Sequence, residues 1–354
     1  MNKAKTFVLL VVMFTFISTL LDAQNIMKKE FNPKYKAYTD SLKKVPYNWS
    51  LPIMGQKLRS RGFDIPYPNG IMLNMYFAKQ QIILENLAIG TEQDPGTYTD
   101  VSNIVRFESI EPIVVGFNFR YDFWLLPFLN LYVMGGYVNS DSHIKMALPV
   151  EMSFVSHGKG PNVGWGTAIA IGLGPVFFSG DYNMVWTFLP QLTSPALAQV
   201  LDIRIGHTFK FRNRPQSNIS VLIGAQYQKL NPYNEGVVNL SELTGISQEE
   251  KDNASGQLDN WYDELPQNQQ EIFAGLYDKL DNWLTNEGDS YLYYSFDKKM
   301  YYPWSMTVGV NYQINKRYTA MAMYTFLGSR QQLVLSLNYR FGIKGKNLLH
   351  GVTL

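Results

Sequence analysis

The sequence predicts an all-β protein, a transmembrane antiparallel β-barrel of about 12 strands (10–12), with a short N-terminal helix and an α-helical insert between strands. Three observations lead to this prediction. The chain begins with a segment typical of exported proteins, it contains strand-length runs that alternate apolar and polar residues, and aromatic residues end the apolar faces of those runs. The 354 residues include 23 Tyr, 21 Phe and 7 Trp, and they suffice for one large domain.

The first element, residues 1–23, is predicted to be a signal peptide. Lys3 and Lys5 precede the apolar run 7–21, and Ala23 offers a small residue for cleavage before Gln24. The alternative, an uncleaved anchor, is disfavoured because the run is shorter than the roughly 20 residues that a spanning helix needs. The predicted location is therefore the outer membrane, reached by export.

Residues 24–62 are predicted to form a basic N-terminal arm with a short helix. The arm has nine Lys and Arg against two acidic residues. Asn32 followed by Pro33 is a typical helix start, which predicts a helix near 33–44.

The barrel is predicted over 63–341, where the alternating runs lie. A soluble sandwich would also alternate, but its strands usually stop near 5–6 residues, whereas these runs have the length that a tilted strand needs to cross a bilayer. The strands are expected near 70–78, 101–108, 111–123, 129–138, 143–152, 164–174, 181–189, 199–212, 217–228, 303–314, 317–327 and 331–341.

The polar face of these strands is expected to line the lumen. The candidate lining residues are Asn118, Arg120, Asp122, Arg204, Lys210, Arg212, Asn311 and Arg340. Basic residues outnumber acidic ones among them, so the wall would favour anionic or polar solutes.

An acidic insert over 241–289 interrupts the strands. It contains twelve Asp and Glu but only two Lys, and apolar residues recur at helical spacing in it. Helices are expected at about 267–285 and 255–265. One interpretation makes the insert a plug in the basic lumen, with Trp261, Phe273, Tyr277 and Trp283 as the packing residues. The other interpretation makes it a solvated surface segment.

The sequence offers little chemistry. The chain has no Cys and four His. Segments 140–143 and 156–158 place Ser beside His, but neighbours in a strand point to opposite faces, so adjacency does not make a Ser–His pair. No His and carboxylate group has metal-ligand spacing. We therefore expect no enzyme activity, no catalytic residue, no cofactor and no metal site.

The export segment, the alternating strands and the aromatic-ended run 333–341 together resemble outer-membrane β-barrel proteins of Bacteroidota-type bacteria. The resemblance implies a location in a Gram-negative outer membrane, contact with outer-membrane lipid, and a closing strand that the barrel-assembly machinery recognises. One feature departs from the pattern. Typical barrels stop at the terminal Phe, whereas this chain continues as a C-terminal tail over 342–354.

Two classes of function remain open. The first is a porin-like transport protein, a narrow channel or gated transporter for a small solute. The alternative is a structural or adhesive surface barrel that presents the 241–289 insert to a partner, and a membrane-embedded lipid hydrolase is less favoured because no triad is evident. The net charge of +2 gives no attraction to nucleic acid.

Overall fold

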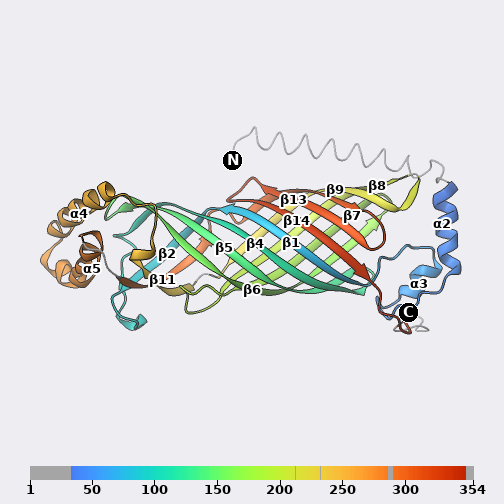
Figure 1. The fold of residues 1–354 in the computed structure, drawn as a ribbon, viewed down its shortest axis with the longest axis horizontal. Coiled ribbons are helices and arrows are strands. Elements are labelled where there is room, and N and C mark those ends of the chain that lie inside the picture. Colours follow the sequence, from blue (N-terminus) through green and yellow to red (C-terminus); the bar gives the residue numbers. More distant parts are fainter. Residues whose placement is uncertain (1–32, 212, 232, 286–289, 348–354) are drawn as a thin grey trace.

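The computed structural model describes residues 33–211, 213–231, 233–285 and 290–347, and it is a long, closed β-barrel with helices at both ends (Figure 1). Ten strands form the barrel, in the order β1, β14, β13, β12, β9, β8, β7, β6, β5, β4. Every neighbouring pair is antiparallel, and β1 closes the barrel by pairing along its whole length with β14. The predicted export segment lies outside the described residues.

The barrel strands range from 9 to 22 residues in length. They are β1 (Asn69–Gln80), β4 (Arg106–Leu126), β5 (Leu129–Leu148), β6 (Met152–Leu173), β7 (Val176–Thr187), β8 (Ala196–Phe211), β9 (Arg214–Leu230), β12 (Trp304–Gln313), β13 (Tyr318–Phe326) and β14 (Arg330–Phe341).

The prediction of a closed antiparallel barrel is confirmed, but twelve strands is not the number observed. The runs expected at 129–138 and 143–152 are one strand, β5, and the run at 111–123 joins the end of 101–108 in β4. The polar residues between 138 and 143 suggested a turn, yet they continue the ladder, with Ser140 opposite Gly158 and Ser142 opposite Ser156. At 20–22 residues, β4, β5 and β6 are about twice as long as the roughly 9–11 residues that a strand needs to cross a bilayer.

A second sheet, absent from the sequence-based prediction, continues from one end of the barrel. Its order is β10 (Tyr233–Asn239), β11 (Tyr291–Met300), β2 (Ile82–Gly90) and β3 (Thr99–Asp100). Two short 3-10 turns, η1 (Pro95–Thr97) and η2 (Leu240–Glu242), flank it. We refer to these four strands as the outer sheet.

The insert forms two helices that pack on the outer sheet, α4 (Gln248–Asp263) and α5 (Gln267–Thr285) (Figure 1). Leu258 of α4 and Trp283 of α5 join a buried core with Leu292 of β11 and with Val150 and Met152 at the start of β6. The helix expected at about 267–285 is confirmed. The helix expected at 255–265 begins earlier, at Gln248, because Ser247 caps it.

The start of α4 is a capping box, which gives a testable contribution to local stability. The Glu250 amide donates to Ser247 Oγ (3.2 Å), and the Ser247 amide donates to Glu250 Oε2 (2.8 Å). Ser247→Ala should destabilise the first turn by about 1 kcal/mol. Faster amide exchange at the first turn of α4 would confirm this, whereas Asn253→Ala, at an exposed position within the same helix, should leave it unchanged.

The same cap should depend on pH. The hydrogen bonds from Ser247 lower the pKa of the Glu250 carboxyl below its ordinary value of 4.5. A lowered acid pKa stabilises the folded form above the ordinary value and loses that effect as the pH falls through the lowered one. The protection of α4 should therefore weaken only below about pH 4.5.

Two further helices lie at the opposite end of the barrel, α2 (Pro33–Lys44) and α3 (Gly55–Ser60) (Figure 1). The helix expected near 33–44 is thus confirmed. Within the described ranges, no helix has both the length and the apolar character needed to cross a membrane.

Candidate functional site

The barrel is apolar outside and polar inside. Phe119, Ile203 and Leu337 point outward and are 56%, 56% and 62% exposed, whereas Asp122, Asp202 and other polar side chains on the opposite faces are buried. Alternation along each strand produces this arrangement, since successive side chains point to opposite faces. A soluble protein rarely exposes so large an apolar surface, so the outside of this barrel is built to contact something other than water.

One group of charged side chains fills the interior near the α3 end of the barrel. Asp122 of β4 is 1% exposed. Its Oδ1 accepts hydrogen bonds from Arg340 Nη2 of β14 (3.0 Å) and from Asn130 Nδ2 of β5 (2.7 Å). Arg120 donates to Asn130 (2.8 Å) and stacks on the Tyr132 ring, with 3.5 Å from its guanidinium carbon to the ring centroid. We call this set the Asp122 network.

A second group is centred on Arg204 of β8. Its Nη1 lies 2.6 Å from Asp181 Oδ1 of β7, and its Nη2 lies 3.2 Å from Asp202 Oδ2. Gln226 of β9 donates to both carboxylate oxygens of Asp202 at 3.2 Å. Both groups therefore pair each buried charge with an opposite charge, as the low dielectric of an interior requires.

The structure places five of the eight predicted lumen residues in hydrogen bonds or ion pairs of the interior. Arg120, Asp122 and Arg340 form one network, Arg204 centres the other, and Asn118 accepts a hydrogen bond from Asn74 of β1 (2.8 Å). The remaining candidates are Asn311, which lies half-buried on the inward face of β12, Lys210, which is exposed near the end of β8, and Arg212, which lies outside the described residues.

Sequence reasoning missed the interior partners Asn130, Asp181 and Gln226. Each lies on the polar face of its strand, so alternation alone would have pointed to them. The predicted lining appeared basic because Asp181 and Asp202 were left out. Together with Asp122, these carboxylates form ion pairs with Arg120, Arg204 and Arg340.

The interpretation of the acidic insert as a plug in the lumen is wrong. Trp261, Phe273, Tyr277 and Trp283 pack among α4, α5, the outer sheet and the adjoining ends of β4, β5 and β6, at one end of the barrel (Figure 1). Tyr277 donates to Asp259 of α4 (2.7 Å), and this bond raises the pKa of Tyr277 to about 12. The apolar stripe is therefore explained by this core, and Arg120, Arg204 and Arg340 take their carboxylates from the barrel itself.

Instead, the segment between α2 and α3 meets the segment that follows β14 at the α3 end of the barrel. The Ile53 amide donates to Leu125 at the end of β4 (2.9 Å), and the Ser50 amide donates to Ile343, just past β14 (3.4 Å). Asn347 donates to the carbonyls of Trp49 (3.1 Å) and Pro52 (3.0 Å). We call residues 45–67 together with 342–347 the end cap, and it gives a structural role to the described part of the tail, residues 342–347.

Gly342 shows how closely this cap fits. A Cβ built at Gly342 would lie 2.4 Å from the Trp49 ring, so only glycine allows the indole to rest on the chain there. Burial also raises the pKa of the Tyr47 phenol, whose hydroxyl donates to the Leu51 carbonyl (2.9 Å).

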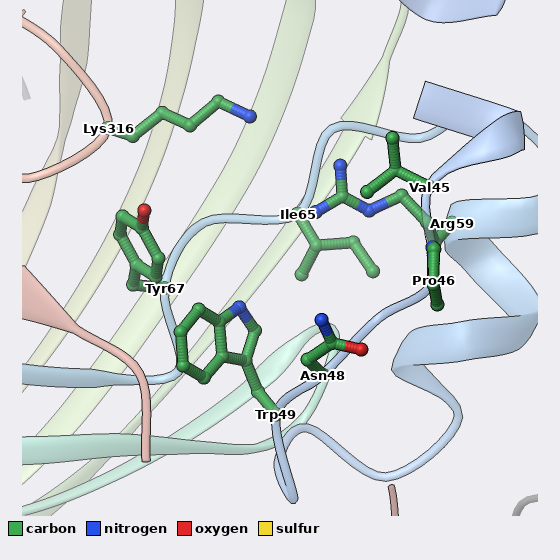
Figure 2. Close-up of a pocket in the computed structure, with 8 residues that line it drawn as sticks. All are labelled: Val45, Pro46, Asn48, Trp49, Arg59, Ile65, Tyr67 and Lys316. Carbon is green, nitrogen blue, oxygen red and sulfur yellow. The ribbon is translucent and has the colours of Figure 1, made fainter. Parts of the chain in front are cut away.

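A cavity of about 170 Å³ lies within the end cap (Figure 2). Its lining side chains are Val45, Pro46, Asn48, Trp49, Arg59, Ile65, Tyr67 and Lys316. The Trp49 and Tyr67 rings meet edge to face, with centroids 5.6 Å apart. Lys316, from the turn between β12 and β13, also pairs with Asp64 (2.9 Å).

At the other end of the molecule, His157 of β6 lies between Asp141 and Thr244. Its Nδ1 is 2.8 Å from Asp141 Oδ1, and its Nε2 is 2.8 Å from Thr244 Oγ1. The backbones of Val155 and Thr244 also exchange two hydrogen bonds (2.8 and 3.1 Å). These exposed contacts fasten the segment that leads into α4 to the ends of β5 and β6. The expected absence of catalysis stays a prediction.

Comparisons with known proteins bear on the fold only. No family model and no curated protein matches the chain. Solved structures similar to it include the translocator domain of the autotransporter NalP from Neisseria meningitidis, at 8% identity and TM-score 0.32, covering 92% of this chain and 98% of that one. The outer membrane protein OprG from Pseudomonas aeruginosa is 6% identical with TM-score 0.36, covering 78% and 98%. The Pseudomonas putida toluene transporter TodX is 8% identical with TM-score 0.26, covering 77% and 88%. Similarity this low supports no inference about function.

Proposed function

We propose that the chain is an outer-membrane β-barrel whose α2 and α3 end faces the periplasm. The closed ladder leaves no strand edge unpaired in the barrel, which is what a bilayer demands of a sheet. Short links join β4 to β5, β6 to β7 and β8 to β9 at the α3 end, and the long connections, including the outer sheet, lie at the other. Bacterial barrels keep their short turns in the periplasm and their long loops outside.

Within that membrane, the function that the geometry supports best is gated passage of a small polar or anionic solute. The observation that carries this proposal is an ion-paired polar interior that ends at a cap, in which hydrogen bonds join the segment after α2 to the segment after β14. Burying charges is costly, and a barrel with only a structural role is better stabilised by an apolar core. Because about ten strands leave an interior that side chains largely fill, passage would require the cap and the networks to rearrange.

The experiment is to weaken the cap and measure conductance in planar bilayers. Asn347→Ala removes the hydrogen bonds to Trp49 and Pro52, and deletion of 342–354 removes the whole tail. Both variants should conduct more often or more strongly than the wild type, with the deletion showing the larger effect. Asn253→Ala, on α4 at the other end, serves as the matched control. Closed barrels in all four proteins would count against gated passage.

A second candidate is a surface barrel that presents the insert to a partner. It is favoured by one observation: α4, α5 and the outer sheet share a buried core at one end of the barrel, which Met152 of β6 joins. The exposed acidic residues on α4 include Glu249, Asp252 and Asp263. Reversing these three charges to Lys should abolish adhesion of whole cells to a basic partner surface while leaving the conductance of the barrel unchanged.

A further inference from the structure

We propose that the cavity in the end cap is a binding site for a small anion bearing a carboxylate or phosphate group. The site is independent of whether the barrel conducts, because it is formed by the periplasmic cap and not by the interior networks. Four elements supply its walls: the segment after α2, helix α3, the segment before β1, and the turn between β12 and β13.

Two cationic side chains, Arg59 and Lys316, line the cavity. Figure 2 shows that Arg59 extends into the cavity from α3, with Lys316 on the far side. Among the described residues, no carboxylate lies within ion-pair distance of Arg59, and its buried Nε has no hydrogen-bond partner. Its guanidinium carbon lies over the Tyr47 ring, 5.7 Å from the ring centroid. A partly buried guanidinium with unused donors is well suited to hold a carboxylate or phosphate in a fork of hydrogen bonds.

The other lining residues add hydrogen-bond donors and no negative charge. Besides the two cations, the lining supplies the Asn48 amide, the Trp49 indole and the Tyr67 ring, and it contains no Asp or Glu. Lys316 gives one ammonium contact to Asp64, outside the lining, and has further N–H groups for a ligand. Arg317 lies over the Tyr67 ring at 5.1 Å and adds positive charge behind the wall. The cavity therefore offers several donors and a positive potential, with no competing negative charge in its walls.

The size of the cavity limits the ligand. A volume of about 170 Å³ is below the roughly 300–1,000 Å³ typical of sites for drug-sized molecules. It admits inorganic phosphate, a short carboxylic acid or the phosphate of a lipid headgroup, but not a nucleotide. Because the cap lies at the periplasmic end of the barrel, both a free periplasmic anion and an inner-leaflet headgroup can reach it.

The test is calorimetric titration of the full-length, detergent-purified protein with sodium phosphate, sodium succinate and monomeric short-chain phosphatidylglycerol. We expect saturable binding at one site per chain. Arg59→Gln should weaken it about tenfold or more, since the hydrogen bonds lost involve a charged group. Arg59→Lys keeps the positive charge but loses the fork of hydrogen bonds, so its affinity should lie between those of the wild type and Arg59→Gln. Binding of phosphatidylglycerol without phosphate or succinate would identify the headgroup as the source of the anion.

Arg61→Gln is the matched control. Arg61 is exposed at the end of the same helix, and its substitution removes the same positive charge. This variant should bind as the wild type does. Heat-modifiability on gels checks that every variant is folded. The proposal is overturned if no probe binds saturably up to about 20 mM, or if Arg61→Gln weakens binding as much as Arg59→Gln.

Discussion

Replacing Asp122 with Asn is expected to lower the free energy of unfolding of the barrel by about 3–5 kcal/mol. Asp122 is 1% exposed, and its carboxylate lies 3.0 Å from Arg340 and 4.0 Å from Arg120. The substitution keeps the shape of the side chain but removes its charge. The guanidinium groups of Arg120 and Arg340, which are only 20% and 11% exposed, then lose the negative charge between them, and their repulsion in a poorly solvated interior is the source of the cost.

Urea unfolding of the refolded protein, followed by tryptophan fluorescence, measures this change. Asp141→Asn is the matched control, since Asp141 also pairs with a basic residue, His157, but both side chains are largely exposed. Exposed pairs contribute about 0–1 kcal/mol, so the control should change little. Equal effects of the two substitutions would show that the Asp122 network contributes no more than a surface ion pair.

The sequence was sufficient to predict the barrel wall, because alternation is a local property. The last strand expected at 331–341 is β14 (Arg330–Phe341), and the strand expected at 217–228 lies within β9. The number of strands was overestimated for a physical reason. Residues 139–143 of β5 are polar on both faces of the strand, so they resemble a turn although they continue the hydrogen-bonded ladder.

The outer sheet could not be predicted because its pairings are remote in sequence. β2 pairs with β11, where Lys299 forms an ion pair with Glu85, 214 residues earlier. Neither strand has the long one-sided alternation of a membrane strand, because the outer sheet packs against helices. With this sheet unknown, the apolar stripe of the insert had no visible partner, and a plug in the lumen was one of two interpretations that remained open, beside a solvated surface segment.

The candidate site was predictable in part. Alternation places Arg120, Arg204 and Arg340 on the inward face, and the structure has them there. The carboxylate that each arginine contacts depends on strand register, which the sequence does not specify. The end cap is less predictable still, since Asn347 and Trp49 are 298 residues apart and meet only after the barrel has closed.

Placing Arg at Val310 should cost about 2–4 kcal/mol if the barrel spans a membrane. Val310 lies in the middle of β12, is 44% exposed, and faces outward beside Val221 of β9. At the bilayer midplane the arginine would meet hydrocarbon, whereas on a soluble protein an exposed substitution usually changes stability by no more than about 0.5 kcal/mol. Unfolding by urea from phosphatidylcholine vesicles measures the difference.

Ile314→Arg controls for depth, because Ile314 is 43% exposed but follows the end of β12, near the interface, where the cost falls to about 0–1 kcal/mol. A large loss at Val310 with a small loss at Ile314 requires a low-dielectric layer around the middle of the barrel. Small losses at both positions would place the apolar face in water and remove the membrane from the proposed function.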